Sequence, residues 1–318
     1  MADVLVTGGQ GFIGSAICQR LLERGDRVTV LDLPEPSFHG LEARGIASEV
    51  ELFEGDVADR PSVEKAISGT TRVFHLAAQT LVGPAASDPL ATFRSNVEGT
   101  WVILEACRQA GPEAVVVASS DKAYGPSPVL PYREDLALQP AATYEASKAA
   151  TDVIARSYSA SAGVPVAVTR LANVFGGGDL NFSRLVPELM ASVVRGREPR
   201  IRSDGTPRRD FLHVSDAVAA YLSLADAVAS GNGLGRAFNA GTGVPTSVAE
   251  VITLIGSIVD LDLGSVVLAE GTPKGEIDEQ FVDPSRLTDL TGWEAQVGLE
   301  DGMAEAFEWY RERPQLCS

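Results

Sequence analysis

Tyr144 and Lys148 are the two residues whose types and spacing best suit proton transfer, because they form a Y-x-x-x-K pattern. On a helix, positions i and i+4 lie on one face. A lysine ammonium beside a phenol, with a further positive charge nearby, lowers the phenol's pKa from about 10 toward neutrality. A tyrosinate can then take a proton from a hydroxyl while the carbon below it gives up hydride. The same spacing also occurs as a surface helix pair, so its meaning depends on its surroundings.

The residues before this pair favour an active site over a surface helix. Val115–Ala118 is a short apolar run that predicts a buried strand, and Ser119 and Ser120 follow it directly. A hydroxyl at the end of that strand could hydrogen-bond the same substrate oxygen as the Tyr144 phenol.

A glycine-rich turn lies between the first predicted strand and the first predicted helix. Gly8, Gly11 and Gly14 fit G-x-x-G-x-x-G, and Gly9 gives a G-x-G-x-x-G reading as well. Such a turn lets the backbone approach a pyrophosphate at a helix N-terminus. The segment predicted to hold a dinucleotide is Gly8, Gly11, Phe12, Ile13 and Gly14.

Asp32 ends the second predicted strand, close to the roughly 20-residue spacing after the glycines that is typical of the acid binding the ribose hydroxyls. No Arg or Lys occurs from Leu31 to His39 to hold a 2′-phosphate. The sequence therefore favours NAD over NADP.

Two further segments fit the same cofactor. Asp56 and Val57 follow the third strand, where the Asp could meet the adenine amine or could simply hold a turn. Small residues after the fourth strand could let the backbone lie against the dinucleotide. These residues are Leu76, Ala77 and Ala78. His75 before them is interpreted as a packed strand residue.

Short apolar runs alternate with helical periodicity over the first half of the chain, which predicts an α/β fold with a doubly wound parallel (Rossmann) sheet. The expected strands are Val4–Val6, Arg27–Leu31, Val50–Phe53, Arg72–His75, Val115–Ala118 and Val166–Thr169. Phe93, Val97, Trp101 and Leu104 are expected to form one stripe of a helix. The predicted division is an NAD-binding domain over 1–172 and a smaller C-terminal substrate-binding lobe over 173–318. The segment 206–240, with strands at Phe211 and Ala237–Asn239, is expected to return to the first domain.

The composition excludes several classes of protein. A formal net charge of −17 opposes binding to nucleic acid or anionic membranes. The three cysteines and three histidines show no metal-ligand spacing, and no metal is expected. No signal peptide or membrane-spanning run is visible, so we expect a reduced, cytoplasmic protein.

Taken together, these motifs resemble the extended short-chain dehydrogenase/reductases, and the likeness covers nearly the whole chain. The shared features are the glycine turn, Asp32, His75-Leu76-Ala77-Ala78, Asn96-Val97-Glu98-Gly99-Thr100, Ser120 and the Tyr144/Lys148 pair. The resemblance implies that Ser120, Tyr144 and Lys148 are a catalytic triad, that Asn96 supports the site, and that the substrate is a nucleotide-sugar.

Asp121 and Lys122 follow the triad serine and bear on which reaction is expected. Once C4 of a hexose is a ketone, the C5 proton is acidic. Loss of water across C5–C6 then needs a base at C5 and an acid at the C6 hydroxyl. A carboxyl with a raised pKa can serve as the acid, and a buried lysine can serve as the base. A 4-epimerase needs neither group.

The Asp-Lys pair is similar to that of CDP-glucose 4,6-dehydratases and of the inverting UDP-N-acetylglucosamine 4,6-dehydratases. The stretches His75–Val82 and Asn173–Asp179 are similar to the CDP-glucose group. We therefore expect an NAD-dependent nucleotide-hexose 4,6-dehydratase with a CDP-glucose-like substrate. Tyr124-Gly125-Pro126, however, fits the general epimerase/dehydratase pattern, and Asp121-Lys122 could be an exposed loop pair. A nucleotide-sugar 4-epimerase and a non-catalytic dinucleotide-sensing protein remain the alternatives.

The C-terminal half supplies candidates for substrate binding. Arg209, in Arg208-Arg209-Asp210-Phe211, resembles the family arginine that clamps the diphosphate, although pairing with Asp210 is the alternative. Further candidates for the diphosphate or nucleotide are Asn173, Asn181, Arg184 and Lys274. The resemblance also implies a homodimer, for which the helices carrying Phe93, Val97 and Trp101 and Ala149, Val153 and Ile154 are apolar enough to pair.

Overall fold

The computed structural model describes residues 1–261, 263 and 277–317. Its strands are β1 (Asp3–Thr7), β2 (Arg27–Asp32), β3 (Glu51–Glu54), β4 (Arg72–His75), β5 (Ala114–Ala118), β6 (Val166–Leu171), β7 (Asn173–Phe175), β8 (Arg208–His213), β9 (Ala237–Ala240), β10 (Pro245–Ser247) and β11 (Glu279–Gln280). Its helices are α1 (Phe12–Glu23), α2 (Gly40–Ala43), α3 (Arg60–Ala66), α4 (Val82–Ser87), α5 (Pro89–Phe93), α6 (Gly99–Ala110), α7 (Thr143–Ala162), α8 (Leu185–Val194), α9 (Val214–Ala229), α10 (Val248–Val259), α11 (Ser285–Thr291) and α12 (Leu299–Arg311).

The larger sheet has seven parallel strands in the order β3-β2-β1-β4-β5-β6-β9. All six strands expected in the first half of the chain are present and lie in this sheet, which confirms the doubly wound α/β fold. The strand order reverses between β1 and β4, and ligands of such sheets bind at the carboxyl ends of the strands beside that switch point. The glycine turn and the Leu76 segment lie at these two strand ends.

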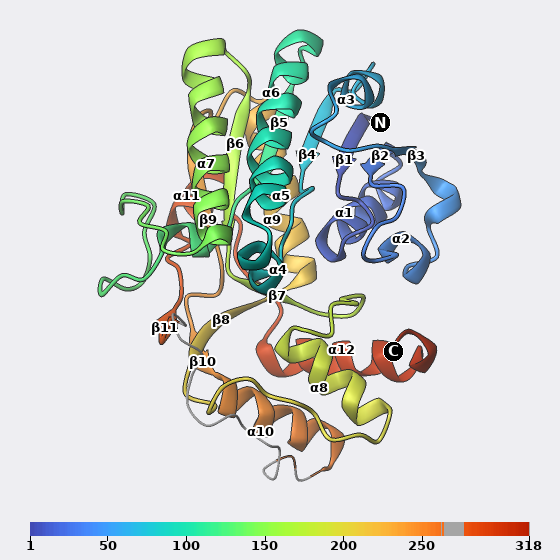
Figure 1. The fold of residues 1–318 in the computed structure, drawn as a ribbon, viewed down its shortest axis with the longest axis vertical. Coiled ribbons are helices and arrows are strands. Elements are labelled where there is room, and N and C mark those ends of the chain that lie inside the picture. The colour runs from blue at the N-terminus through green and yellow to red at the C-terminus, as the bar shows by residue number, and fades with distance from the viewer. Residues whose placement is uncertain (262, 264–276, 318) are drawn as a thin grey trace.

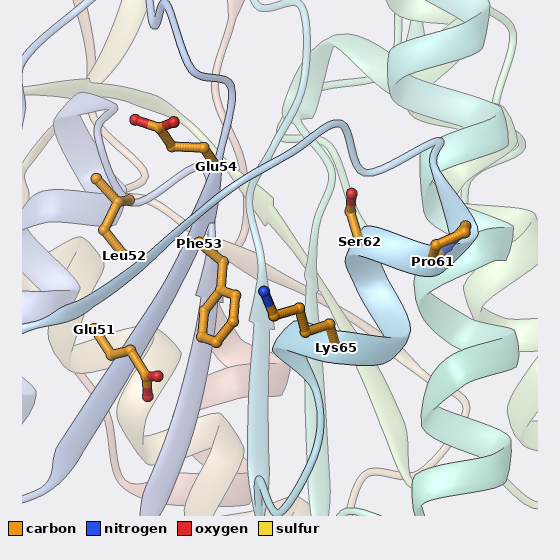
Figure 2. Close-up of a pocket in the computed structure, with 7 residues that line it drawn as sticks. All are labelled: Glu51, Leu52, Phe53, Glu54, Pro61, Ser62 and Lys65. Atoms are coloured by element: carbon orange, nitrogen blue, oxygen red, sulfur yellow. The ribbon is translucent and has the colours of Figure 1, made fainter.

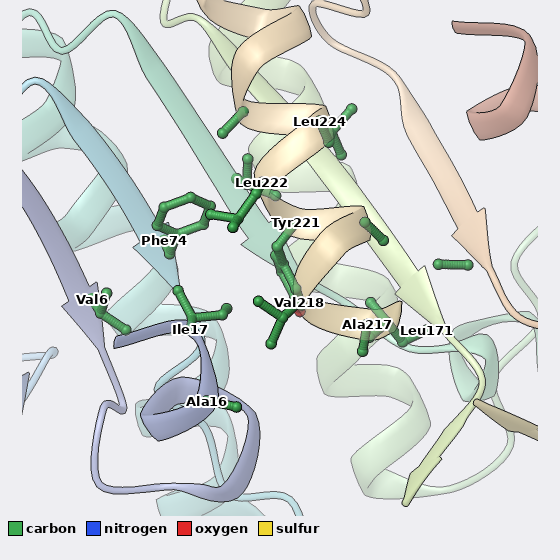
Figure 3. Close-up of a cluster of buried hydrophobic side chains, with 14 of the residues drawn as sticks. Val6, Ala16, Ile17, Phe74, Leu171, Ala217, Val218, Tyr221, Leu222 and Leu224 are labelled. Atoms are coloured by element: carbon green, nitrogen blue, oxygen red, sulfur yellow. The ribbon is translucent and has the colours of Figure 1, made fainter. Parts of the chain in front are cut away.

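Helices cover both faces of the large sheet (Figure 1). On one face, α1 and α9 pack over the strands, and Phe74, Ile17 and Tyr221 meet in a single apolar core (Figure 3). On the other face, residues of α3, α6 and α7 pack on the strands through Val63, Leu104 and Ala155. Because both faces are buried, the strands are continuous apolar runs rather than alternating ones.

The second sheet is small and holds β8 at its centre, paired with β7, β10 and β11. The expectation that the strand containing Phe211 returns to the large sheet is therefore wrong. Only one residue, Ala172, separates β6 from β7, so the chain leaves the large sheet there, and β8 pairs with the departing strand. By contrast, α9 packs on β5 and β6, and β9 pairs with β6. Figure 1 shows α8, α10 and α12 gathered beside the small sheet.

The stripe expected from Phe93 to Leu104 is interrupted by a π-helical turn at Arg94–Glu98, between α5 and α6. The wider turn shifts the helix register, so Leu104 is fully buried while Phe93 and Trp101 are exposed. The predicted stripe assumed a regular helix. It is correct for Leu104, which is buried, and wrong for Phe93 and Trp101, which are exposed.

A hollow of roughly 500 Å³ lies at the outer edge of the large sheet, between β3 and α3 (Figure 2). Within it, the Lys65 ammonium is 5.2 Å from the centre of the Phe53 ring. None of its lining residues is among the candidate site residues, which lie at the carboxyl ends of the strands instead.

Candidate active site

The glycine turn is too tight for side chains. Gly8 has φ +73°, and a Cβ there would be 2.7 Å from the backbone nitrogen of Ala77. At Gly14 a Cβ would be 2.2 Å from the carbonyl oxygen of Gly8. Gly11 precedes α1 and provides no side-chain cap, so the helix begins at Phe12 and Ile13 with N–H groups available to an anion.

Asp32 lies at the end of β2, beside this turn. Its Oδ2 accepts a hydrogen bond from the Gln10 N–H at 2.8 Å, and its Oδ1 accepts one from the Leu33 N–H at 2.9 Å. Burial raises the pKa of Asp32, and the two backbone donors oppose that shift. The carboxylate is thereby fixed next to the glycine turn, as the sequence predicted.

The other cofactor candidates surround the same turn. Leu76 and Ala77 donate backbone hydrogen bonds to the Thr7 carbonyl (3.1 Å) and the Thr7 hydroxyl (3.2 Å), and Ala78 follows them. Val57 is buried, while Asp56 accepts a hydrogen bond from the Ala58 N–H at 2.9 Å. Asp56 therefore holds a turn through its Oδ1, and its contact with the adenine stays a prediction.

Two buried polar residues, at the end of β4 and in the π-helical turn, support this region. His75 is hydrogen-bonded to Thr7 and Thr100, and burial lowers its pKa to about 3, so the ring is neutral. Asn96, in the π-helical turn, accepts a hydrogen bond from the Gln79 N–H and donates to the Ser147 hydroxyl at 2.8 Å. Asn96 therefore ties the segment after β4 to the helix that carries Tyr144 and Lys148.

Tyr144 and Lys148 lie on α7, and both are buried. Burial raises the pKa of Tyr144 to about 12, while the positive charge of Arg184 and a hydrogen bond with Ser120 act in the opposite direction. This differs from the expectation of a phenol with a pKa near neutrality. The physical reason is that burial outweighs the favourable charges in this chain.

The Lys148 ammonium donates a hydrogen bond to the Ala118 carbonyl at 2.9 Å. Burial lowers the pKa of Lys148 to about 8. The Ser119 hydroxyl donates to the Lys148 carbonyl at 3.0 Å, so the end of β5 is joined to α7 at two points. The predicted serine, tyrosine and lysine are thus brought together at one edge of the large sheet.

Asp121 and Lys122 lie in a 3-10 turn, Asp121–Tyr124, directly after Ser120. Asp121 is buried and accepts a hydrogen bond from the Ser120 hydroxyl at 3.0 Å. Burial raises the pKa of this carboxyl, while the charges of Lys122 and Arg209 oppose the shift. Asp121 is therefore not part of an exposed loop pair, and both residues belong to the same site as Tyr144.

The substrate candidates are divided between this site and its rim. Arg209 is buried on β8 and donates to the Arg208 carbonyl at 2.7 Å, within range of Asp121's charge. Arg184 pairs with Asp179 at 3.0 Å. Asn181 is buried, and its Nδ2 has no hydrogen-bond partner among the residues the structure describes. Asn173 begins β7. Lys274 lies outside the described residues.

Sequence reasoning did not identify Gln280, which the structure places beside Lys122. Its Oε1 accepts a hydrogen bond from the Lys122 ammonium at 3.0 Å. Gln280 is 158 residues from Lys122 in the sequence and carries no motif, so only the pairing of β11 with β8 could reveal it.

The residues at the glycine turn fit a dinucleotide. The turn leaves no room for Cβ atoms, the partly buried carboxylate of Asp32 lies beside it, and the Oε1 of Gln10 is buried without a partner in the described part of the chain. Among the described residues no cluster of His, Cys, Asp or Glu could hold a metal, and none of their helices is long and apolar enough to cross a membrane.

Comparison with known proteins agrees with this arrangement. The model of the NAD dependent epimerase/dehydratase family matches residues 4–241. The chain is 33% identical to a UDP-glucose 4-epimerase of Mycolicibacterium smegmatis, covering 98% of this chain and 99% of that protein. It is 32% identical to a dTDP-glucose 4,6-dehydratase of Streptomyces griseus, covering 96% and 93%.

The similar solved structures likewise include both 4-epimerases and 4,6-dehydratases. A UDP-glucose 4-epimerase of Thermotoga maritima, crystallised with UDP-glucose, matches with a TM-score of 0.89 at 29% identity, covering 98% of this chain and 99% of that one. A dTDP-glucose 4,6-dehydratase of Streptomyces venezuelae, crystallised with NAD, matches with a TM-score of 0.90 at 27% identity, covering 98% of each chain.

Proposed function

The chain belongs to the NAD dependent epimerase/dehydratase family, and on that basis we propose that it is a nucleotide-hexose 4,6-dehydratase. Members of this family are enzymes, which sets aside the purely dinucleotide-sensing alternative. Residues 1–172 would bind NAD and residues 173–318 would bind the nucleotide-sugar. When bound, NAD accepts hydride from C4 of the hexose and returns it, to C6 in a dehydratase or to C4 in an epimerase.

In this proposal the cofactor is held by the glycine turn and two neighbouring strand ends. The Phe12 and Ile13 end of α1 faces the pyrophosphate, and the Asp32 carboxylate receives the ribose hydroxyls. Support comes from the missing Cβ atoms at Gly8 and Gly14 and from the fixed orientation of Asp32. Contacts of Asp56 and Val57 with the adenine, and of Leu76 to Ala78 with the dinucleotide, are part of the same proposal.

Tyr144 takes the proton of the C4 hydroxyl, and Ser120 hydrogen-bonds the same oxygen. Support comes from the hydrogen bond between Ser120 and Tyr144, and from the Arg184 charge that favours the ionised phenol. Lys148 stays close to this pair through its contact with the Ala118 carbonyl. Burial holds the pKa of Tyr144 at about 12 despite the Arg184 charge, so ionisation of the phenol near neutral pH would need the further positive charge that bound NAD would supply.

The observation that favours a dehydratase is the buried Asp121 with its raised pKa, directly beside Lys122. A carboxyl that keeps its proton can give it to the C6 hydroxyl as that group leaves as water. As the neutral amine, Lys122 can accept the C5 proton, which leaves a C5–C6 double bond next to the ketone. An epimerase has no use for an acid and a base at these two carbons.

A nucleotide-sugar 4-epimerase is the second candidate, because the similar protein from Mycolicibacterium smegmatis has that activity. Among nucleotides we propose CDP first, on the resemblance of Asp121-Lys122 to CDP-glucose 4,6-dehydratases. The named relatives act on UDP- and dTDP-sugars, so these nucleotides must be included in any test.

A local concentration of positive charge supports an anionic substrate. The whole chain carries −17, yet Lys122, Arg184 and Arg209 all act on groups of this site. A guanidinium matches the oxygens of a diphosphate, so we assign the diphosphate to Arg209 together with Asn173, and we place Asn181 and Arg184 nearer the nucleotide. The same role for Lys274 rests on its sequence alone.

We also propose that two copies pair through α5, α6 and α7. Leu90, Phe93, Trp101 and Val153 are exposed there, whereas Ala149 is buried within the chain. Trp101→Glu should convert a dimer into a monomer in analytical ultracentrifugation, and an unchanged sedimentation coefficient would contradict this interface. The three cysteines are all free and buried, which is consistent with a reducing compartment such as the cytoplasm.

The direct test of the reaction is mass spectrometry of the products formed from CDP-, dTDP-, UDP- and GDP-glucose. A dehydratase yields a product that has lost one water from one of these substrates, and Lys122→Ala should suppress that loss. A product of unchanged mass with inverted C4 would instead establish the epimerase.

A further inference from the structure

Gln280 is a buried polar side chain with one half of its amide unused. It is fully buried on β11, and its Oε1 accepts a hydrogen bond from the Lys122 ammonium at 3.0 Å. Its Nε2 has no hydrogen-bond partner among the described residues. A buried donor without a partner is costly, so such a group in a site suggests a partner supplied by a ligand.

The sheet register explains why this side chain reaches the site. β11 runs parallel to β8, with Gln280 opposite Arg209. Arg209 in turn acts on the charge of Asp121, and Lys122 is the next residue in the chain. One amide therefore stands between the arginine of the small sheet and the acid–base pair that follows β5.

The chemistry of the two groups fixes which way the amide faces. A lysine ammonium has three donors and no acceptor, so it must meet the oxygen of the amide. The neutral amine that takes the C5 proton still has N–H groups to donate to the same oxygen, which leaves its lone pair for the substrate. The NH₂ group of Gln280 is then directed elsewhere and can donate only to an acceptor. A hexose offers such acceptors in its hydroxyl and ring oxygens.

We propose that Gln280 is a positioning residue that joins Lys122 to the bound hexose. Its Oε1 orients the Lys122 ammonium, and its Nε2 donates a hydrogen bond to an oxygen of the sugar. This inference rests on the proposed function, because it requires a sugar beside Lys122. A glutamine that only stabilises β11 would affect folding but would not distinguish ligands with and without a hexose.

The hexose contact is tested by equilibrium binding to NAD-loaded protein in a Tyr144→Phe background, which prevents turnover. Calorimetry compares CDP-glucose with CDP, UDP-glucose with UDP and dTDP-glucose with dTDP. Gln280→Met and Gln280→Glu both lack the donor. Each should raise the Kd of the sugar-bearing ligand about tenfold and leave the Kd of the bare nucleoside diphosphate unchanged. Glu279→Gln, the neighbour on β11, is the matched control and should change neither.

The orientation of Lys122 is tested by kcat in the otherwise wild-type enzyme. Gln280→Glu keeps an acceptor for Lys122, but its charge favours the ammonium, so kcat should fall near neutral pH and recover as the pH rises. Gln280→Met has no acceptor and should lose kcat about tenfold at every pH. Thermal unfolding of each variant checks that β11 is intact.

Several results would overturn the proposal. These are equal weakening of the binding of sugar-bearing and bare ligands, no weakening of the binding of either, or the same pH dependence of kcat for the Met and Glu variants. If Lys122→Ala still releases water, the proposed role of Lys122 in dehydration fails. The comparison of ligands with and without hexose would still decide whether Gln280 contacts the sugar.

Discussion

Arg170 and Asp152 form a buried, bidentate ion pair that joins β6 to the helix carrying Tyr144 and Lys148. Arg170 Nε lies 2.8 Å from Asp152 Oδ2, and its Nη2 lies 3.1 Å from Oδ1. Arg170 Nη1 also donates to the Tyr124 hydroxyl at 2.8 Å, and Tyr124 donates to Asn239 on β9. One network thus fixes α7, two strands and the turn containing Asp121.

Breaking this pair should be strongly destabilising. Arg170→Met leaves a buried carboxylate without that partner, and we expect a loss of about 3–5 kcal/mol in the free energy of unfolding. The double variant Arg170→Met/Asp152→Leu should recover much of that loss, because neither charge then remains buried. Urea denaturation measures both, and equal stability of the single variant and the wild type would contradict the account.

Lys148 should reduce the stability of the free protein. Its pKa is lowered from 10.5 to about 8 by burial, so the folded state binds its proton less tightly than the unfolded state. This penalty is fully present below about pH 8 and is relieved as the pH rises from 8 toward 10.5. Lys148→Met should therefore be more stable than wild type at pH 7, by roughly 1–3 kcal/mol.

The check on Lys148 is the pH dependence of unfolding by urea. The stability advantage of Lys148→Met should shrink between pH 8 and 10, while catalytic activity is lost at every pH. An advantage that stays constant with pH would show that the effect comes from packing rather than from the buried charge.

Asp32 should control both the affinity for NAD and the discrimination against NADP. Asp32→Ala removes a carboxylate that is held by two backbone donors, and we expect the Kd for NAD to rise about 10- to 100-fold. The preference for NAD over NADP should narrow, because the repulsion of a 2′-phosphate is lost. Calorimetric titration measures both ligands, with the exposed Glu35→Ala as the control that should bind like wild type.

Six strands of the large sheet could be predicted from the sequence alone, because buried parallel strands are continuous apolar runs such as Val115–Ala118. It also predicted residues that the structure brings to the strand ends, since Ser120 and Asp32 each come at the end of a recognisable strand and Tyr144 belongs to a Y-x-x-x-K pattern. It misplaced the strand containing Phe211, because periodicity does not say which sheet a strand joins. The π-helical turn and the burial that raises the pKa of Tyr144 depend on packing, and Gln280 depends on strand register.

The central claim is that hydride removed from C4 returns to C6 as water is lost. It is tested most directly with a nucleotide-glucose that carries deuterium at C4, followed by NMR and mass spectrometry of the product. The account predicts deuterium at C6 of a product lighter by one water in the wild type, and Asp121→Asn should slow that loss of water by about 10²–10⁴. Deuterium retained at C4 of an unchanged-mass, inverted sugar would contradict it and identify a 4-epimerase.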